Sequence, residues 1–433
     1  MNEKGLIYEI KSDLNRLGLQ DNPFSESAEF TSSQNIDEIF TGRRAELKKV
    51  ISTLIGQKRK RILIYGWWGI GKTAFMYQIL KILKQKELKK DTLSTYISLP
   101  PEIDIATASL ISLAFEMKDD EWAQRYLNLM GIYQGGNLYK RKKKFDAGIP
   151  GLKGSIEEEP LNTNLAQIPS LSFDYLLKRA LNYYKRIIIF IDDLDKQDPD
   201  KVKKLLRDSQ GLLKGNASFV LSGHPSGLSK DIVTGNMGIF DLTQELTLMD
   251  FDTMNQMLIK YLNSARKKNK FHRFFRILKN YKKHSELDLT DPKSVRPFTV
   301  DAAKRICKYS DGHPRWLNRL ANYVLLTAQD MKVDTIDIEI IEKGRQYARK
   351  ELQSQPELTS DLLYLFHLVE EKGLLTDENV SIEELRKIGV NTFNELLPLL
   401  EKLIQNDLLR HRPSETHLQY IVSPIVKNEK IDL

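Results

Sequence analysis

Nine consecutive residues have the types and spacing needed to bind the phosphates of a nucleotide. They fit the Walker A pattern G-x-x-x-x-G-K-[ST] and end on one further small residue. The residues are, in order, Gly66, Trp67, Trp68, Gly69, Ile70, Gly71, Lys72, Thr73 and Ala74. The glycines let the backbone curl so that amide hydrogens face the phosphates. We expect the Lys72 ammonium to neutralise β- and γ-phosphate oxygens, and the Thr73 hydroxyl to hold Mg²⁺.

The segments on either side of this loop have the patterns of a strand and a helix. The apolar run from Arg61 to Tyr65 predicts a buried strand, and the residues after Thr73 predict a helix to about Lys90. A phosphate loop needs this context, because the helix N-terminus adds the positive end of its dipole to the site. Strand, spacing and helix together favour a nucleotide site over a chance glycine turn.

A pair of carboxylates follows a second apolar strand, in the manner of a Walker B motif. We expect a strand from Ile187 to Ile191, and Asp192 and Asp193 come directly after it. A carboxylate on a neighbouring strand completes the magnesium shell of a loop-bound nucleotide, and we assign this role to Asp192. Asp193 takes the position of the base that orients the attacking water. Many P-loop ATPases have the longer glutamate there, so we expect slow turnover. Asp195 is interpreted as a helix cap.

Strands alternate with helices through the first 249 residues, which predicts an α/β core with a parallel sheet. Further strands are expected at 95–99, 218–222 and 240–248, and helices at 105–130, 171–184 and 199–213. Residues 131–160 break this rhythm with many glycines and prolines, so we interpret them as an insertion. Residues 1–249 are therefore predicted to form the P-loop core with an N-terminal segment.

The rest of the chain is predicted to be mainly helical. Helical periodicity dominates residues 250–352 and predicts a separate helical lid. A polar break at 353–357 opens a third predicted domain, residues 353–433, with helices at 358–371, 381–388 and 391–405. Residues 408–424 then have the pattern of a β-hairpin with a polar tip. Three helices followed by a hairpin are typical of a winged helix.

With both motifs placed, the chain resembles AAA+ ATPases of the initiator and transposition-regulator kind over nearly its whole length. This group includes origin-recognition proteins and transposon target-selection ATPases. Thr41 to Leu47 looks like the family's G-R-x-x-E-L segment, which implies that Arg43 helps to enclose the adenine. Asn22 to Phe24 is similar to an upstream turn of the family. The resemblance implies ATP and Mg²⁺ as cofactors, and ATP hydrolysis as the activity.

Two nucleotide-sensing positions of this family also have counterparts in the chain. Ser222-Gly223-His224-Pro225 lies at the sensor 1 position, where either Ser222 or His224 would touch the γ-phosphate or the attacking water. The segment from Gly312 to Leu320 looks like the sensor 2 helix. By this resemblance Arg315 reaches the phosphates, and Pro314 lies near the base and ribose. An arginine there would couple nucleotide state to the angle between core and lid.

One family feature is missing, and it keeps a second interpretation open. Many AAA+ oligomers supply an arginine finger from the segment after sensor 1, but residues 227–246 contain no arginine and only one basic residue, Lys230. Either Arg207 takes that role or the finger is absent. The Asp-Asp-Leu-Asp and Gly-x-Pro elements also resemble the STAND signalling ATPases and the KAP group, which often work as switches.

Cationic segments make DNA a candidate partner, because the formal net charge is +8. Cations alternate with aromatics from Arg266 to Arg276, which suits phosphate contact and base stacking but equally a lid helix that buries its phenylalanines. The run from Arg141 to Lys144 suits a phosphate contact or a solvated loop.

The predicted winged helix has its cations in the hairpin. Residues 391–405 carry acidic side chains and a single cation, which is poor for a phosphate groove. Arg410, His411 and Arg412 would contact a DNA backbone through the wing. Winged helices also bind protein, so a protein partner or self-assembly stays open.

The composition is that of a globular protein inside the cell. With 433 residues, 41% of them hydrophobic and 29% charged, the chain is long enough for two or three domains. Apolar runs stay well below the roughly 20 residues that span a bilayer, and the first residues lack the apolar stretch of a signal peptide. The lone Cys307 is expected to be a buried thiol. We therefore expect a cytoplasmic protein without a membrane partner.

Two hypotheses about function follow from these features. The first is an ATP-dependent molecular switch that binds DNA, with hydrolysis resetting it, in replication, transposition, or mobile-element and defence biology. The second is a STAND-like signalling or scaffold ATPase whose partner is protein. A metabolic kinase is disfavoured by the lid and the winged helix. Loss of DNA affinity with rising salt separates the first two.

Overall fold

The chain divides into two compact units, each described by itself below. The structure, a computed structural model, describes residues 12–24, 39–56, 58–100, 103–131, 168–194, 199–225, 228, 232, 238–266, 291–412 and 419–428. The sheet unit comprises Arg43–Trp67 and Phe75–Leu246. The helical unit comprises Met1–Gly42, Trp68–Ala74 and Thr247–Leu433, so it includes most of the predicted phosphate loop.

Within the described residues, five parallel strands form the sheet unit's core in the order β2-β3-β4-β1-β5. The strands are β1 (Arg61–Tyr65), β2 (Thr92–Ser98), β3 (Arg186–Asp192), β4 (Ser218–Gly223) and β5 (Leu242–Glu245). This confirms the predicted α/β P-loop fold. The predicted boundaries differ most at β2, which begins three residues earlier, and at β5, which is shorter than expected.

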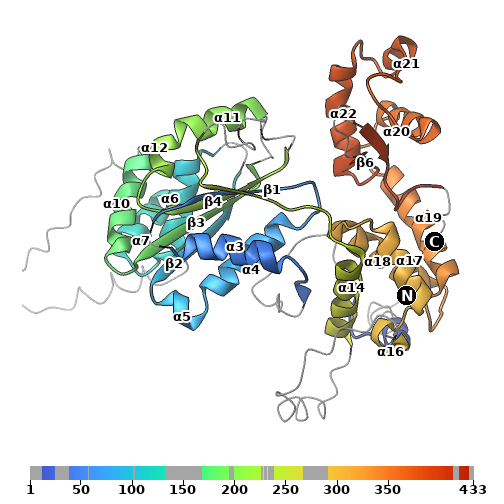
Figure 1. Ribbon diagram of the computed structural model, residues 1–433, viewed down its shortest axis with the longest axis horizontal. Helices are drawn as coiled ribbons and strands as arrows, with labels where there is room; N and C mark the ends of the chain where they lie inside the picture. The colour runs from blue at the N-terminus through green and yellow to red at the C-terminus, as the bar shows by residue number, and fades with distance from the viewer. Residues whose placement is uncertain are drawn as a thin grey trace, which may run out of the picture. The chain divides into compact units, whose positions relative to one another are not determined.

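Helices cover both faces of this sheet (Figure 1). In β3, Ile187, Ile189 and Ile191 belong to one hydrophobic cluster with residues of α6, α7 and α10, while Ile188 and Phe190 are equally buried on the other face. This burial on both sides explains the unbroken apolar pattern of the strand. The helices in this part of the chain are α3 (Arg44–Leu54), α4 (Lys72–Leu83), α5 (Lys86–Lys89), α6 (Ile105–Glu116), α7 (Glu121–Leu129), α10 (Pro169–Leu181), α11 (Pro199–Asp208) and α12 (Gln210–Leu213).

The helix predicted at 105–130 is two helices, α6 and α7, because a carboxylate interrupts it. Asp120 accepts hydrogen bonds from the backbone N–H groups of Trp122 and Ala123 and so begins a new helix. Its other oxygen pairs with Arg179 of α10 at 2.7 Å. Apolar periodicity continues across such a break and therefore does not reveal it.

The helical unit has its own hydrophobic core. Its helices between residues 250 and 353 include α14 (Phe251–Ala265), α16 (Pro292–Val295), α17 (Val300–Tyr309), α18 (Pro314–Asp330) and α19 (Ile338–Gln353). Met254, Ile306 and Leu317 are buried between them. Cys307 is buried here as expected, and burial raises the pKa of its thiol.

The end of the chain contains the elements expected of a winged helix, in the expected order. They are α20 (Ser360–Lys372), α21 (Ile382–Lys387), α22 (Phe393–Gln405), β6 (Leu409–Arg412) and β7 (Gln419–Val422). The two strands pair antiparallel, and a bridge joins Leu375 to Tyr420. Leu400 belongs to the same hydrophobic cluster as Leu317 of α18. The assignment as a winged helix and the boundary at 352 stay predictions.

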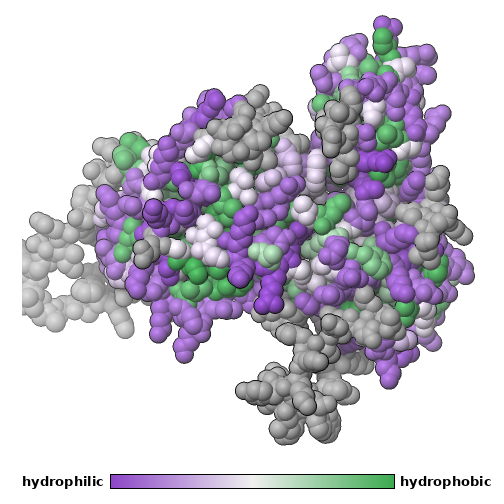
Figure 2. All heavy atoms as spheres, viewed as in Figure 1, coloured by the Kyte–Doolittle hydropathy of each residue, from purple (hydrophilic) through white to green (hydrophobic). Residues whose placement is uncertain are grey.

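Several expected features lie outside the described residues. They are nearly all of the predicted insertion, including Arg141 to Lys144, most of the cationic and aromatic stretch after Arg266, and Asp195 and Lys230. In the described part of the chain, no helix is long and apolar enough to cross a membrane. On the face seen in Figure 2, hydrophilic residues predominate and separate small apolar areas.

Candidate nucleotide-binding site

The phosphate loop has the backbone that its sequence predicts. β1 ends at Tyr65 and α4 begins at Lys72. Between them the φ angles of Gly69 and Gly71 are +73° and +97°, in the region that L side chains rarely adopt. Glycine is therefore required at both positions for the chain to turn from strand into helix. Lys72 and Thr73 are the first two residues of α4, where N–H groups without helical partners favour an anion.

Each of the two tryptophans in the loop has an aromatic or cationic neighbour in its own unit. In the helical unit, the Lys72 Nζ lies 5.5 Å from the centre of the Trp68 ring. In the sheet unit, Trp67 meets the His224 ring edge-on, with the ring centres 5.0 Å apart. His224 itself is fully buried. The loop's large side chains thus hold their positions by packing.

Asp192 is a buried carboxylate at the end of β3, held by hydroxyl donors from both neighbouring strands. The Tyr96 hydroxyl of β2 donates to its Oδ2 at 2.8 Å, and the Ser222 hydroxyl of β4 donates to its Oδ1. Burial and the charge of Asp192 raise the pKa of Tyr96, so this hydroxyl keeps its proton and remains a donor. Ser222 is one of the two residues that the sequence predicts to sense the γ-phosphate. In the structure its hydroxyl donates a hydrogen bond to Asp192.

Asp193 is held in a different way from its neighbour. Its φ is +64°, an uncommon angle for a residue other than glycine. Its N–H donates to Asp192 Oδ1 at 3.0 Å, and its Oδ2 accepts a hydrogen bond from the Ser98 hydroxyl at 2.5 Å. Ser98 ends β2 directly opposite Asp192 in the strand pairing. The sheet therefore fixes both carboxylates at the edge from which the phosphate loop leaves β1.

The backbone of Arg315 packs against the phosphate loop within the helical unit. Arg315 lies in the first turn of α18, and its N–H donates to the Gly69 carbonyl at 3.3 Å. A Cβ added to Gly69 would come within 2.7 Å of the Arg315 Cβ. The glycine at 69 is therefore needed for this close approach as well as for the turn.

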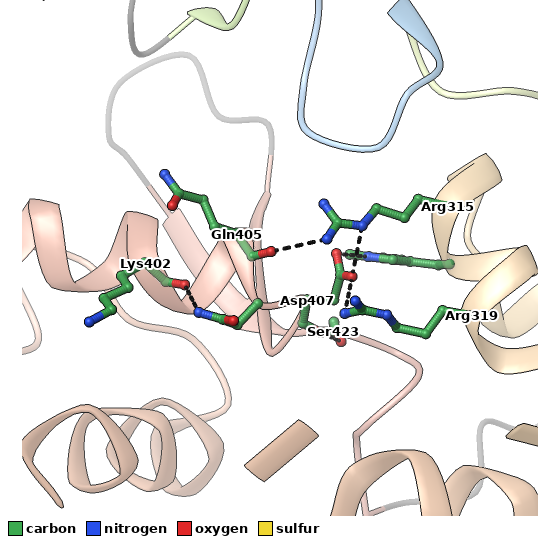
Figure 3. Close-up of polar contacts among 8 residues, drawn as sticks. Arg315, Arg319, Lys402, Gln405, Asp407 and Ser423 are labelled. Carbon is green, nitrogen blue, oxygen red and sulfur yellow. Dashed lines mark hydrogen bonds and ion pairs between the residues drawn. The ribbon is translucent and has the colours of Figure 1, made fainter. Parts of the chain in front are cut away.

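The side chain of Arg315 points to Gln405 and Asp407 (Figure 3). Its Nε lies 3.2 Å from Asp407 Oδ2, and its Nη2 donates to the Gln405 carbonyl at 3.5 Å. Asp407 lies in the turn between α22 and β6 and is 2% exposed. Sequence reasoning missed Asp407, because a single aspartate in a turn has no pattern that marks it.

The residues expected near the base lie at the starts of helices. Pro314 is the first residue of α18, where its fixed φ and missing N–H fit the helix start. Arg43 directly precedes α3, and burial lowers the pKa of its guanidinium. The turn expected at Asn22 to Phe24 is present, because the Asn22 side chain accepts the Phe24 N–H at 3.0 Å. Their roles toward adenine stay predictions.

Thr73 and Asp192 have the ligand chemistry that Mg²⁺ prefers. A hydroxyl and a carboxylate are hard oxygen donors, and Mg²⁺ takes most of its remaining ligands from phosphates and water. Asp192 Oδ2 accepts a hydrogen bond from the Tyr96 hydroxyl at 2.8 Å. Within the described ranges, no group of three or more His, Cys, Asp or Glu residues could hold a metal ion by itself. Each of the two residues thus has the oxygen donor type that Mg²⁺ takes beside phosphate and water.

Comparison with protein families identifies the sheet unit. Residues 43–234 match the model described as the KAP family P-loop domain, which is less than half of the chain. This part of the chain is thus a KAP-type P-loop NTPase domain. No curated protein matches the sequence.

Comparison with solved structures finds matches that cover most of the chain, among them the following three. The Aeropyrum pernix ORC1 protein, solved in complex with DNA, is 13% identical, with 92% of this chain and 94% of that chain covered and a TM-score of 0.48. Cdc6p from Pyrobaculum aerophilum is 15% identical over 92% and 94%, with a TM-score of 0.43. The Thermotoga maritima RuvB Holliday junction branch migration motor is 17% identical over 88% and 92%, with a TM-score of 0.37.

Proposed function

We propose that this chain, whose residues 43–234 form a KAP-type P-loop domain, is an ATP-dependent molecular switch. It binds ATP with Mg²⁺ at the phosphate loop, hydrolyses it slowly, and passes the state of the nucleotide to its C-terminal helices. Lys72 binds the β- and γ-phosphates, and Thr73 and Asp192 hold the metal.

The observation that carries this proposal is the contact between Gly69 and Arg315. The start of α18 lies on the phosphate loop so closely that no side chain fits at Gly69. Any movement of the loop on phosphate binding should therefore displace the start of α18. The same helix carries the Arg315 side chain to Asp407 in the last part of the chain. Loop, helix and C-terminal turn thus form one continuous series of contacts.

Hydrolysis is assigned to Asp193, which accepts a proton from the attacking water or orients it. Its position beside the metal ligand Asp192 supports this role. Its short side chain and its hydrogen bond to Ser98 both favour a slow reaction.

Nucleotide binding and phosphate release test the proposal. Wild-type protein should bind a fluorescent ATP analogue in the presence of Mg²⁺ and release phosphate. Lys72→Ala should weaken binding by about 100-fold, as expected for a lost charge-assisted contact. Lys49→Ala, which removes an exposed charge from α3, should bind as wild type does. Asp193→Asn should bind ATP normally and lose about 100-fold in turnover. Equal affinity of the Lys72 and Lys49 variants would exclude the loop as the phosphate site.

DNA is the partner that we propose for the switch. The net charge of +8 supports a polyanionic partner. The exposed Arg412, at the end of β6, extends this positive charge to the hairpin. A steep fall in affinity with salt, with a slope of about −0.9 for each phosphate contacted, is the expected result.

A protein partner is the alternative, and one observation favours it. Arg410 pairs with Asp311, and His411 Nε2 lies 2.9 Å from Glu401 Oε1. Two of the three residues expected to contact DNA through the wing thus have carboxylate partners inside the molecule. Groups engaged in this way contribute less to a DNA contact. If the chain retains no DNA at low salt, the protein-binding alternative replaces the DNA proposal.

A further inference from the structure

The turn between α22 and β6 presents a buried carboxylate to one helix. Among the described residues, three side chains of α18 contact Asp407: Arg315, Trp316 and Arg319. Figure 3 shows the two arginines beside the carboxylate. The Trp316 indole N–H donates to Oδ1 at 2.8 Å, and Arg319 Nη1 donates to Oδ2 at 2.5 Å. Both carboxylate oxygens therefore have a strong donor without any contribution from Arg315.

Of the three side chains that contact Asp407, that of Arg315 can move away most easily. Its Nε lies 3.2 Å from Asp407 Oδ2, and its side chain is 30% exposed, against 8% for Arg319. A partly exposed ion pair is weak, because water screens it. If Arg315 moves away, Asp407 remains paired with Arg319 and hydrogen-bonded to Trp316, so no buried charge is left without a partner.

The backbone of Arg315 stays at the phosphate loop whichever way its side chain points. Its N–H is bonded to the Gly69 carbonyl, two residues before Gly71 and three before Lys72. A phosphate has more charge than a carboxylate and accepts both arms of a guanidinium. The side chain thus has two anionic partners within the same unit, one in the turn and one that a nucleotide would bring.

We propose that Asp407 is a built-in competitor of the nucleotide for Arg315. The proposal rests on the proposed ATP-binding function and adds its regulation. Without a terminal phosphate, Arg315 holds the turn at Asp407. With a nucleoside triphosphate bound, the guanidinium moves to the γ-phosphate, and the Asp407 carboxylate keeps its contacts with Trp316 and Arg319. The position of the Arg315 side chain thereby couples the bound nucleotide to the turn between α22 and β6.

Removing the competitor should strengthen triphosphate binding selectively. In Asp407→Asn the negative charge is lost while the shape is kept, so Arg315 is available to the γ-phosphate. We expect about fivefold tighter binding of the slowly hydrolysed analogue ATPγS, and ADP affinity within about twofold of wild type. The affinities are measured by calorimetry on the full chain.

A matched variant separates competition from loosening of the turn. The Ser423 hydroxyl donates to the Asp407 backbone carbonyl at 2.6 Å, so Ser423→Ala loosens the same turn and leaves the carboxylate in place. We expect this variant to bind ATPγS and ADP as wild type does. If it reproduces the tighter ATPγS binding, or if Asp407→Asn strengthens both nucleotides equally, competition is excluded.

Amide hydrogen exchange on the wild-type protein tests the proposal even if Asp407→Asn does not fold. The N–H groups of Asp407 and Leu408 are bonded to Ile404 and Leu403 carbonyls and report opening of the turn. They should exchange several-fold faster with ATPγS than with ADP. Equal rates with both bound nucleotides would overturn the proposal. If the wild-type chain binds neither nucleotide, the proposed ATP function fails, which is a separate outcome.

Discussion

The Ser98 hydroxyl and the Asp193 carboxylate are joined by a hydrogen bond of 2.5 Å across two neighbouring strands. Because the hydroxyl donates, it occupies one acceptor position of the carboxylate. A carboxylate held in this way is less free to turn toward a water molecule. The strand pairing that places Ser98 opposite Asp192 thus restrains the residue to which we assign hydrolysis.

Ser98→Ala should therefore raise the rate of ATP hydrolysis. The lost hydrogen bond contributes roughly 1 kcal/mol, so we expect turnover to rise about fivefold with unchanged ATP affinity. Single-turnover phosphate release measures this. Ser94→Ala removes a buried hydroxyl from the same strand and should leave turnover unchanged. A slower Ser98 variant would mean that the hydroxyl positions Asp193 for the reaction and does not restrain it.

The phosphate loop could be predicted from the sequence because its requirements are local. Gly69 and Gly71 need positive φ angles, and Lys72 begins the next helix, all within a few residues. The parallel sheet was predictable for a similar reason, since strands buried on both faces are apolar throughout. Helix boundaries such as the one at Asp120 were missed, because a cap interrupts the backbone without interrupting the apolar pattern.

The partner of Arg315 could not be predicted in the same way. Asp407 is 92 residues further along the chain, and only the packing of α18 against the last turn brings the two together. An ion pair between residues far apart in the chain leaves no periodicity in the sequence, because tertiary structure determines which residues meet. The same holds for Tyr96 and Ser222, which donate to Asp192 from two different strands.

Acid should destabilise the helical unit through His313. This side chain is 7% exposed, and burial lowers its pKa to about 4. Since the unfolded chain takes up this proton near pH 6.5, the proton favours unfolding as the pH falls from about 6.5 to about 4. Near pH 4 this effect lowers the free energy of unfolding by about 3 kcal/mol.

Replacing His313 by phenylalanine should reduce this acid sensitivity. The aromatic ring keeps its contact with Trp316, whose centre lies 4.0 Å away, but no longer titrates. Thermal unfolding midpoints at pH 7 and pH 4.5 should differ less in His313→Phe than in wild type. His367→Phe, at an exposed position, serves as the control. An unchanged difference in the His313 variant would show that other groups cause the acid response.

Changing the four cations at 141–144 together to alanine should weaken DNA binding without altering ATP affinity. Each lost phosphate contact removes about 0.9 from the slope of log affinity against log salt, so the slope should shrink by three to four. A control of equal charge removes exposed lysines from α3 and α5, namely Lys48, Lys49, Lys86 and Lys89. If both variants lose the same affinity, the effect is one of net charge and the 141–144 segment is not the contact.

Arg315→Ala should separate nucleotide binding from the response to it. The variant loses the contact with the γ-phosphate and the contact with Asp407, while the Gly69 contact of its backbone remains. One charged contact contributes about 1.5 to 3 kcal/mol, so ATP affinity should fall roughly ten- to hundredfold and ADP affinity should change little.

Limited proteolysis between α19 and α20, with ADP and with ATPγS at saturating concentration, measures the response of the chain to the nucleotide. Wild type should give two cleavage patterns, and the variant should give one and the same pattern with both nucleotides. Arg315→Lys keeps the charge but not the planar fork, so it should respond partially. A variant without the guanidinium that still gives two patterns would show that nucleotide state reaches the C-terminal helices by another route.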